Sequence, residues 1–357
     1  MRRVLIFMAA CLAGLWAGFR ISQGPAGTPP AATESQQAAA QAYLAQNLAP
    51  MPDGWDRDLF LAAPGVTLEV GTAPAAGPAK GTLVFVPGYT APLDMYGAEF
   101  SRLRAAGWNV AAFSYRGQGR SVRRGPDPQM GWMGDMAHLA ADLAAYVRTL
   151  DGPVGVMAVS KGGHIALRMA IDAGPDVLGY ALVAPMVAIR TEPFSPGLAQ
   201  GLAMALPVIG LADTYAPAQG PWDGADVFDD PAALAEGGTC ARDPARAHLR
   251  EALFTLEPGL RVGGPSARWI AEVFEAQDVL RDRAGDIATP VWMALASDDG
   301  SVVTEASEAL CRAMGDCVSV EVPDSLHCMI EDRPEIRDAV FDGALAFFEA
   351  RLAADRP

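Results

Sequence analysis

The sequence has little basic charge. Its 357 residues contain 27 Lys+Arg against 42 Asp+Glu, a formal net charge of −15, and only Lys80 and Lys161 are lysines. A surface that binds nucleic acid has to offer positive charge to the phosphate backbone, and electrostatic adsorption to anionic lipid has the same requirement. The composition therefore argues strongly against a nucleic-acid partner and weakens the case for electrostatic adsorption to anionic lipid.

Histidine is also scarce, with four residues. The chain has no internal repeat and no Cys/His spacing typical of a zinc site, so we expect no metal and no cofactor. A hydrophobic fraction of 51% with 19% charged residues excludes wholesale disorder. The length allows about two domains, or one large domain with an insertion.

An apolar run, Val4–Phe19, follows a basic pair at the N-terminus and ends at Arg20. This pattern is typical of a secretory signal or an N-terminal anchor, so residues 1–21 are predicted to be a signal peptide or membrane anchor. Lipidation at Cys11 is a third alternative. We expect the protein to be exported, either periplasmic or anchored to the inner membrane and facing the periplasm. Residues 22–50, rich in Ala, Gln and Pro, are predicted to form a tether.

Cysteine usage fits an oxidising compartment. Apart from the one in the N-terminal run, the cysteines are Cys240, Cys311, Cys317 and Cys328, an even number. Cys311 and Cys317 are close enough in sequence to pair across a helix-to-strand turn, and Cys240 and Cys328 would then link an inserted region to a late loop. The alternative is four free thiols.

Short apolar runs alternate with helical patterns from about residue 67, which predicts an α/β fold with a mostly parallel sheet covered on both faces. The alternation breaks in the middle of the chain and resumes near residue 290. We therefore predict a core in two parts, residues 51–185 and 289–357, with a helical cap at 186–288 beside the carboxyl ends of the strands. The predicted strands are Thr67–Val70, Thr82–Val86, Asn109–Ser114, Val154–Val159, Leu178–Val183, Val291–Ala296 and Val318–Val322.

One of these strands runs into a serine turn and then directly into a helix. Ser160 is preceded at two residues by Ala158 and followed at two residues by Gly162. This is the pattern of a nucleophile elbow, in which a strained turn demands small residues on both sides of the serine. Ala158 replaces the usual first glycine. The beginning of a helix after Ser160 would favour a developing oxyanion.

A serine nucleophile needs a histidine base, and in this fold class the histidine follows in the chain. His327 lies in a loop between the last predicted strand and the final helix, and it is the predicted base. We expect His164 to be structural, His248 to be a solvated residue of the cap, and His138 to lie at the surface.

The position of loops after the predicted strands also identifies candidates for the acid and the oxyanion hole. The loop after Val291–Ala296 offers Asp298 and Asp299, of which the spacing to the next helix favours Asp299. The two oxyanion donors are predicted to be the backbone N–H groups of Tyr89 and Lys161. The Lys161 side chain would either attract an anionic head group or have no role beyond its backbone.

Four segments of the chain carry a family pattern: Tyr115–Ser121, Ser160–Arg168, Gly263–Trp269 and His327–Glu331. They resemble the bacterial lysophospholipase and monoacylglycerol lipase branch of the α/β hydrolases, a serine aminopeptidase-type group. The resemblance covers about residues 67–352. It departs from the family pattern at Pro87-Gly88, where His-Gly is usual, at Lys161, where Met is common, and in an acid loop one residue longer than usual.

The resemblance implies an α/β-hydrolase fold with Ser160, Asp299 or Asp298, and His327 as a catalytic triad. It also implies a single-chain lipid ester as substrate, a lysophospholipid or a monoacylglycerol. The apolar stretch Leu198–Leu206 would hold the acyl chain or be plain core of the cap.

Three alternatives remain from the sequence: a general carboxylesterase, a non-catalytic protein of the same fold, and an aminopeptidase. The aminopeptidase requires a carboxylate cluster to hold a substrate amine. The candidates for that cluster are Asp223, Asp226, Asp229 and Asp230.

Overall fold

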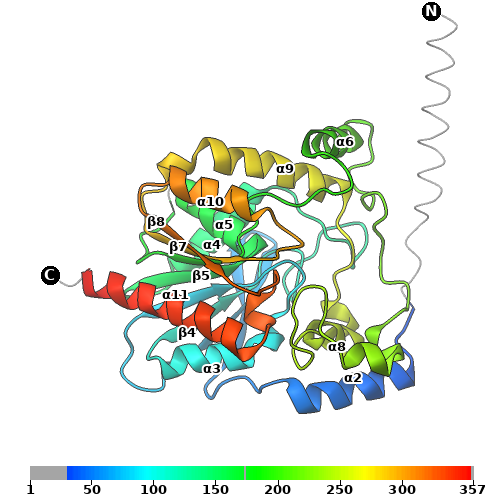
Figure 1. The fold of residues 1–357 in the computed structure, drawn as a ribbon, viewed down its shortest axis with the longest axis horizontal. Coiled ribbons are helices and arrows are strands. Elements are labelled where there is room, and N and C mark those ends of the chain that lie inside the picture. Colours follow the sequence, from blue (N-terminus) through cyan, green and yellow to red (C-terminus); the bar gives the residue numbers. More distant parts are fainter. Residues whose placement is uncertain (1–29, 173, 355–357) are drawn as a thin grey trace, which may run out of the picture.

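A single eight-stranded sheet organises the chain (Figure 1). The computed structural model describes residues 30–172 and 174–354, so the predicted signal or anchor segment, residues 1–21, lies outside the described residues. The strand order is β1-β2-β4-β3-β5-β6-β7-β8. The strands are β1 (Asp56–Ala63), β2 (Val66–Ala73), β3 (Thr82–Val86), β4 (Asn109–Phe113), β5 (Val154–Val159), β6 (Tyr180–Val183), β7 (Val291–Ala296) and β8 (Cys317–Val322).

The sheet is parallel from β4 to β8, while β1 and β2 pair antiparallel at one edge. Strands β3, β5 and β7 have the bounds that the sequence predicts, because each is an unbroken apolar run that is buried on both faces. Strand β1 was not predicted. It is an edge strand that begins Asp56-Arg57-Asp58, and the apolar residues 59–63 that follow are exposed or only partly buried.

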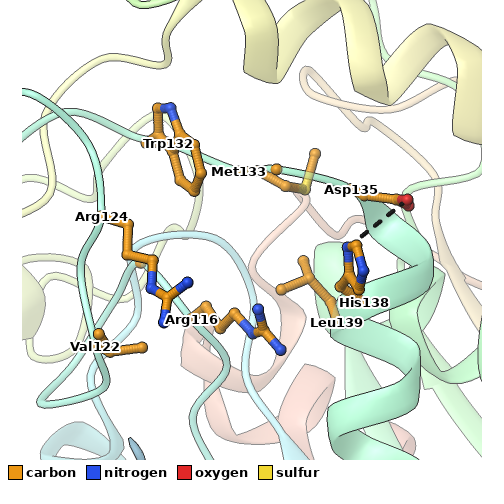
Figure 2. Close-up of a pocket in the computed structure, with 10 residues that line it drawn as sticks. Arg116, Val122, Arg124, Trp132, Met133, Asp135, His138 and Leu139 are labelled. Carbon is orange, nitrogen blue, oxygen red and sulfur yellow. Dashed lines mark ion pairs between the residues drawn. The ribbon is translucent and has the colours of Figure 1, made fainter. Parts of the chain in front are cut away.

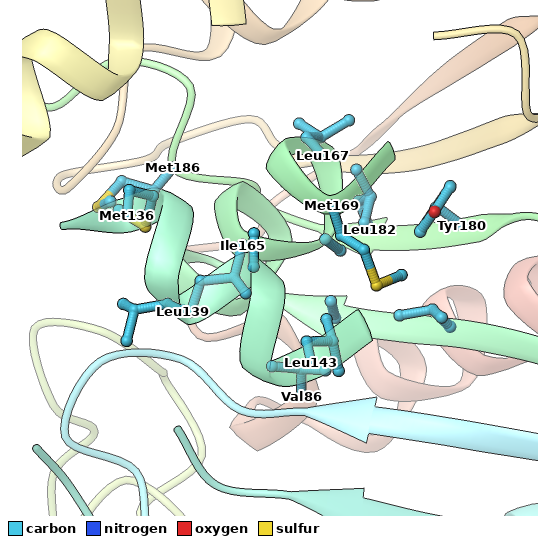
Figure 3. Packing of buried hydrophobic residues seen from close by; sticks show 14 of the residues in the cluster. Val86, Met136, Leu139, Leu143, Ile165, Leu167, Met169, Tyr180, Leu182 and Met186 are labelled. Atoms are coloured by element: carbon cyan, nitrogen blue, oxygen red, sulfur yellow. The ribbon is translucent and has the colours of Figure 1, made fainter. Parts of the chain in front are cut away.

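Helices cover both faces of the sheet, and the two layers are visible in Figure 1. One face carries α4, α5 and α10, and their apolar side chains pack on the strands as Figure 3 shows for Leu139, Leu143 and Ile165. The other face carries α3 and α11. The helices are α2 (Glu34–Asn47), α3 (Gly97–Ala105), α4 (Met136–Val147), α5 (Lys161–Ile171), α6 (Pro196–Val208), α7 (Pro231–Leu234), α8 (Leu249–Leu256), α9 (Ala267–Asp282), α10 (Thr304–Ala313) and α11 (Pro334–Ala354).

The predicted cap, residues 186–288, lies between β6 and β7 and contains α6 to α9. Its last helix does not behave as a cap. Val273, Ala276 and Leu280 of α9 are buried in the same core cluster as α4 and α5, so α9 belongs to the layer that covers the sheet. The prediction that the whole segment forms a cap is therefore wrong for α9, because its apolar face packs against the helices that cover the sheet.

The predicted tether, residues 22–50, is also corrected. Residues 34–47 form α2, which begins with a capping box between Thr33 and Gln36. Helix α2 packs on α8. Its Tyr43 ring lies edge-on to Phe228 and to His248, the residue before α8, and its hydroxyl donates to the Pro244 carbonyl oxygen at 2.7 Å. The alanine and glutamine content that suggested a tether is also favourable for a helix, and tertiary packing decides between the two.

Both predicted disulfides are present. Cys311 and Cys317 join the end of α10 to the start of β8, and Cys240 joins the insertion to Cys328, next to His327. The alternative of four free thiols is therefore wrong. Among the residues that the structure describes, no helix has both the length and the apolarity needed to cross a bilayer.

The first testable prediction concerns the attachment of α2. Replacing Tyr43 by Ala removes a buried ring and its hydrogen bond, so we expect the free energy of unfolding to fall by about 3 kcal/mol. Tyr43→Phe loses only the hydroxyl and should cost about 1 kcal/mol. Urea unfolding measures both, with the exposed Gln46→Ala as the control. Equal stability of Tyr43→Ala and wild type would show that α2 is not bound through this residue.

Candidate active site

The junction between β5 and α5 places Ser160 at the carboxyl end of the sheet. Ser160 has a φ of 49° and a ψ of −114°, a conformation that L-residues rarely adopt. Its N–H donates to the Val183 carbonyl oxygen at 2.9 Å. A Cβ on Gly162 would lie 2.5 Å from the Val86 carbonyl oxygen and 2.6 Å from that of Pro87. Glycine is therefore required at 162 so that α5 can begin against the end of β3.

Ser160, His327 and Asp299 form a chain of hydrogen bonds. The Ser160 Oγ lies 2.9 Å from His327 Nε2, and His327 Nδ1 lies 2.7 Å from Asp299 Oδ2. The other oxygen of Asp299 accepts from the N–H groups of Ser301 and Val302, both at 2.8 Å. The carboxylate is thereby fixed on both sides, and it fixes the imidazole that faces the serine.

The two candidate acids differ in their surroundings. Asp299 is 3% exposed. Burial acts to raise the pKa of its carboxyl, but the hydrogen bond and charge of His327, together with two backbone N–H groups, outweigh burial and lower that pKa. Asp298 points to solvent, with a side chain that is 75% exposed and 3.4 Å from Arg242. Only Asp299 contacts His327.

The remaining histidines lie away from Ser160 Oγ. His164 is buried on α5, where Nδ1 lies 2.8 Å from the Met186 carbonyl oxygen and burial lowers its pKa to about 4. The prediction of a solvated His248 is wrong: this residue is 7% exposed and lies 3.0 Å from the Glu236 carbonyl oxygen, because α2 covers it. His138 is exposed, as predicted.

Figure 2 shows the surroundings of His138. This cavity of about 390 Å³ is lined by Arg116, Arg124 and Trp132. It contains neither Ser160 nor His327, and it is separate from the site.

The loop that carries Tyr89 is held by a residue that the sequence did not single out. The side-chain amide of Gln118 accepts from the Thr90 N–H at 3.0 Å and donates to the Gly88 carbonyl oxygen at 3.1 Å. Among the described residues, no acceptor pairs with the Tyr89 N–H. The Lys161 N–H is in the first turn of α5, where the helix offers no acceptor. Gln118 belongs to the Tyr115–Ser121 motif, so that motif is the sequence feature that could have identified it.

The Lys161 side chain is buried, although lysine is almost never buried without a partner. Its Nζ lies over three rings, at 5.5 Å from the centroid of Tyr89, 4.7 Å from Tyr115 and 5.3 Å from Trp269. Burial lowers its pKa to about 7. The side chain does not line the pocket at Ser160, so the interpretation in which it attracts an anionic head group is wrong.

Ser160 and His327 open into a cavity of about 260 Å³. Ile189 lines this cavity and also a groove of about 320 Å³ between α6 and α9. The groove is largely apolar, with Phe194, Leu202 and Leu206 among its lining residues. Helix α6 buries only Ala203, so the apolar stretch of α6 is not plain core.

The insertion is tied to the loops that carry the acid and the base. Cys240 bonds to Cys328, and its carbonyl oxygen also accepts from the Cys328 N–H at 2.8 Å. Arg242 donates to the Asp324 carbonyl oxygen at 2.7 Å. These contacts fix the segment on both sides of His327.

The four carboxylates that an aminopeptidase would need are hydrogen-bonded to other parts of the protein, outside the Ser160 cavity. Asp226 accepts from the Thr255 hydroxyl, Asp229 from the side-chain amide of Gln36, and Asp230 from a backbone N–H at the start of α7. Asp223 accepts from the Ala225 N–H, and none of the four lines the Ser160 cavity. Within residues 30–172 and 174–354, no group of three His, Cys, Asp or Glu side chains is arranged to hold a metal ion.

The second prediction follows from the buried lysine. Between its folded pKa of about 7 and its ordinary value of 10.5, the unfolded chain binds a proton that the folded chain does not. Wild-type stability therefore rises with pH across this window relative to Lys161→Met, and is lost as pH falls toward 7. The stability advantage of Lys161→Met should be largest below pH 7 and shrink toward pH 10.5. Urea unfolding at about pH 6, 8 and 10 tests this, and a pH-independent difference would contradict it.

The comparisons with known proteins identify a family and similar proteins. Residues 77–334 match the family model "Serine aminopeptidase, S33". The chain is 31% identical over 214 residues to lysophospholipase L2 of Escherichia coli, which covers 58% of this chain and 60% of that relative's length. The chain therefore spans less than two thirds of that relative.

Solved structures with the same fold include two lipases. A monoacylglycerol lipase of Paleococcus ferrophilus superposes with a TM-score of 0.59 at 20% identity, covering 80% of this chain and 98% of that one. A soluble variant of monoglyceride lipase from Saccharomyces cerevisiae gives a TM-score of 0.65 at 18% identity, covering 86% and 98%. With the family model matched over more than half of its length, the chain belongs to the serine aminopeptidase-type family of α/β hydrolases.

Proposed function

We propose that this protein is a serine hydrolase that cleaves the carboxylic ester of a single-chain lipid, a lysophospholipid or a monoacylglycerol. The observation that carries the proposal is the chain of hydrogen bonds from Ser160 through His327 to Asp299, in a cavity that shares its lining residue Ile189 with an apolar groove. The likeness to lysophospholipase L2 supports the same substrate class.

The first step forms an acyl-enzyme. Ser160 Oγ attacks the ester carbonyl carbon while its proton passes to His327 Nε2, and Asp299 stabilises the imidazolium. The carbonyl oxygen becomes an oxyanion that the N–H groups of Tyr89 and Lys161 bind. The carbonyl double bond re-forms, the ester C–O bond breaks, and the alcohol leaves with the proton from His327.

The second step hydrolyses the acyl-enzyme and regenerates the free enzyme. Water gives a proton to His327 Nε2 and attacks the acyl carbon, and the same two N–H groups hold the second oxyanion. The bond to Ser160 Oγ then breaks, Ser160 regains its proton from His327, and the fatty acid leaves. The protein's own residues supply every proton transfer, because His327 is acid and base in turn.

An acyl chain fits the groove between α6 and α9. Phe194, Leu202, Leu206 and Phe274 would bury the chain methylenes, each worth about 0.8 kcal/mol when removed from water. A short polar ester would leave this groove without an occupant. The groove is the feature that favours a lipid over a general carboxylester.

The second candidate function is an aminopeptidase, which the name of the matching family favours. It requires a carboxylate that faces the cavity, and Asp223, Asp226, Asp229 and Asp230 lie outside the cavity lining. Glu331 does line the cavity, so turnover of aminoacyl amides belongs in the first assay.

We further propose that the protein is exported and stays near the membrane through its N-terminal segment. The basic pair followed by Val4–Phe19 supports export, and the two disulfides suit an oxidising compartment. Placement beside a membrane would keep the enzyme close to single-chain lipids. Fractionation of cells that express the full chain tests this.

The third prediction tests the nucleophile. Wild type should release fatty acid from lysophosphatidylcholine and monoacylglycerol and take a fluorophosphonate label, because Ser160 is activated by His327. Ser160→Ala should lose the label and about 10⁴- to 10⁶-fold in kcat. Labelled wild type that turns over only aminoacyl amides would replace the lipid proposal by the aminopeptidase. An unlabelled, inactive wild type would overturn both.

The fourth prediction separates the two acids. Asp299→Asn leaves His327 without a carboxylate and should lower kcat by about 10³- to 10⁴-fold. Asp298→Asn is the matched control one residue away, and because its side chain is exposed it should stay within about twofold of wild type. Steady-state kinetics on one ester decides the matter. A larger loss in Asp298→Asn would reverse the assignment.

A further inference from the structure

The cavity at Ser160 carries two charged side chains that the reaction does not use. Arg250 comes from α8 in the insertion, and Glu331 comes from the short 3-10 helix Met329–Glu331 after His327. Both line the cavity together with Ser160 and His327. Charges in the wall of a catalytic cavity have to be matched by the substrate or by each other.

Arg250 is only partly satisfied by the protein. Its Nε and one terminal nitrogen donate to Glu251 Oε1 at 3.0 and 2.6 Å, and the other terminal nitrogen donates to the Thr90 hydroxyl at 3.2 Å. A guanidinium has five N–H donors, so two remain for a ligand. The side chain is 33% exposed, and it lines the cavity at Ser160.

Glu331 also keeps an unused group. Its Oε1 accepts from the Tyr96 hydroxyl at 3.2 Å, and no hydrogen bond to Oε2 occurs among the residues that the structure describes. Burial raises the pKa of this carboxyl, whereas Arg250 and Arg246 act in the opposite direction. A cationic group of a ligand would favour the ionised form further.

The two charges do not neutralise each other by contact. Within the described part of the chain, no ion pair of 4 Å or less joins Arg250 to Glu331, while Arg250 pairs with Glu251. The cavity therefore offers separate positive and negative partners. A zwitterion satisfies both, and a net anion would be repelled by Glu331.

We propose that Arg250 and Glu331 form a head-group subsite for a zwitterionic phosphoester, in which Arg250 binds the phosphate and Glu331 binds the amine. The proposal rests on the proposed lipid-ester hydrolysis and identifies which lysophospholipids the site prefers. Since the groove beyond Ile189 takes the acyl chain, the alcohol part of the ester meets the remaining wall of the cavity, where both charges lie. Arginine suits phosphate because its planar fork donates two parallel hydrogen bonds.

The test compares substrates that differ only in the head group. Arg250→Met keeps the length of the side chain and removes its charge. It should lower kcat/KM for lysophosphatidylethanolamine by about 10- to 100-fold and change that for monoacylglycerol by less than about threefold. Glu331→Gln keeps an acceptor for Tyr96. It should lower kcat/KM for lysophosphatidylethanolamine about tenfold relative to lysophosphatidylglycerol, which has no amine.

Two controls exclude a merely structural effect. Thr90→Val removes the hydrogen bond to Arg250 but keeps the charge, so it should not change the ratio between head groups. Arg281→Met, an exposed charge on α9, should match wild type. Direct binding gives a readout apart from turnover: glycerophosphoethanolamine should bind to Ser160→Ala in calorimetry, and the Arg250→Met double variant should lose it.

The experiments distinguish failure of the head-group subsite from failure of the proposed function. If wild type hydrolyses both lipid classes and Arg250→Met lowers all substrates equally, Arg250 only positions the Thr90 loop and the subsite is overturned, while the proposed function stands. If Thr90→Val reproduces the loss in the head-group ratio, the subsite is likewise overturned. If wild type hydrolyses neither class, the proposed function and the subsite both fall.

Discussion

The backbone of Ser160 is held in a left-handed conformation, and the geometry of the site depends on it. Such a conformation costs on the order of 1–3 kcal/mol, and it persists because the residue is bonded on both sides. Its N–H donates to Val183, and its carbonyl oxygen accepts from the N–H groups of His164 and Met186. Gly162 permits the close approach of α5 to β3. The result is an Oγ that projects beyond the sheet toward His327.

The parallel sheet brings distant segments to this serine because the carboxyl ends of parallel strands share one edge. The loop after β7 supplies Asp299, and the segment after β8 supplies His327. The insertion then fastens this assembly, since Cys240 is covalently bound to the residue next to His327. Gln118 holds the loop after β3 in the same way by hydrogen bonds. Each reacting group is thus anchored by a neighbour from another part of the chain.

Charge is distributed unevenly in this acidic protein. Lys161 follows Ser160 in the chain and Arg250 lines the Ser160 cavity, but their surroundings differ. The Lys161 ammonium group lies among three aromatic rings and does not line the cavity. Burying its charge therefore costs desolvation free energy. Arg250 is partly paired with Glu251 and opens on the cavity with donors to spare. In the proposed site, the apolar groove would hold the acyl chain and Arg250 would bind the head group.

The sequence alone determined the parallel strands, the serine elbow at Ser160 and the late histidine His327, because local apolar runs and fixed chain order encode them. It suggested the two cysteine pairs, but only the distances in the fold decided them against free thiols. It favoured Asp299 over Asp298 only by spacing, and it took α2 for a tether and His248 for a solvated residue of the cap. It placed Gln118 and Glu331 in recognised motifs without giving either a role, and it did not single out Arg250. Which carboxylate meets the imidazole, and which helix covers which face, depends on contacts between residues far apart in the chain. Only the tertiary structure, which sets burial and distances, decides these contacts.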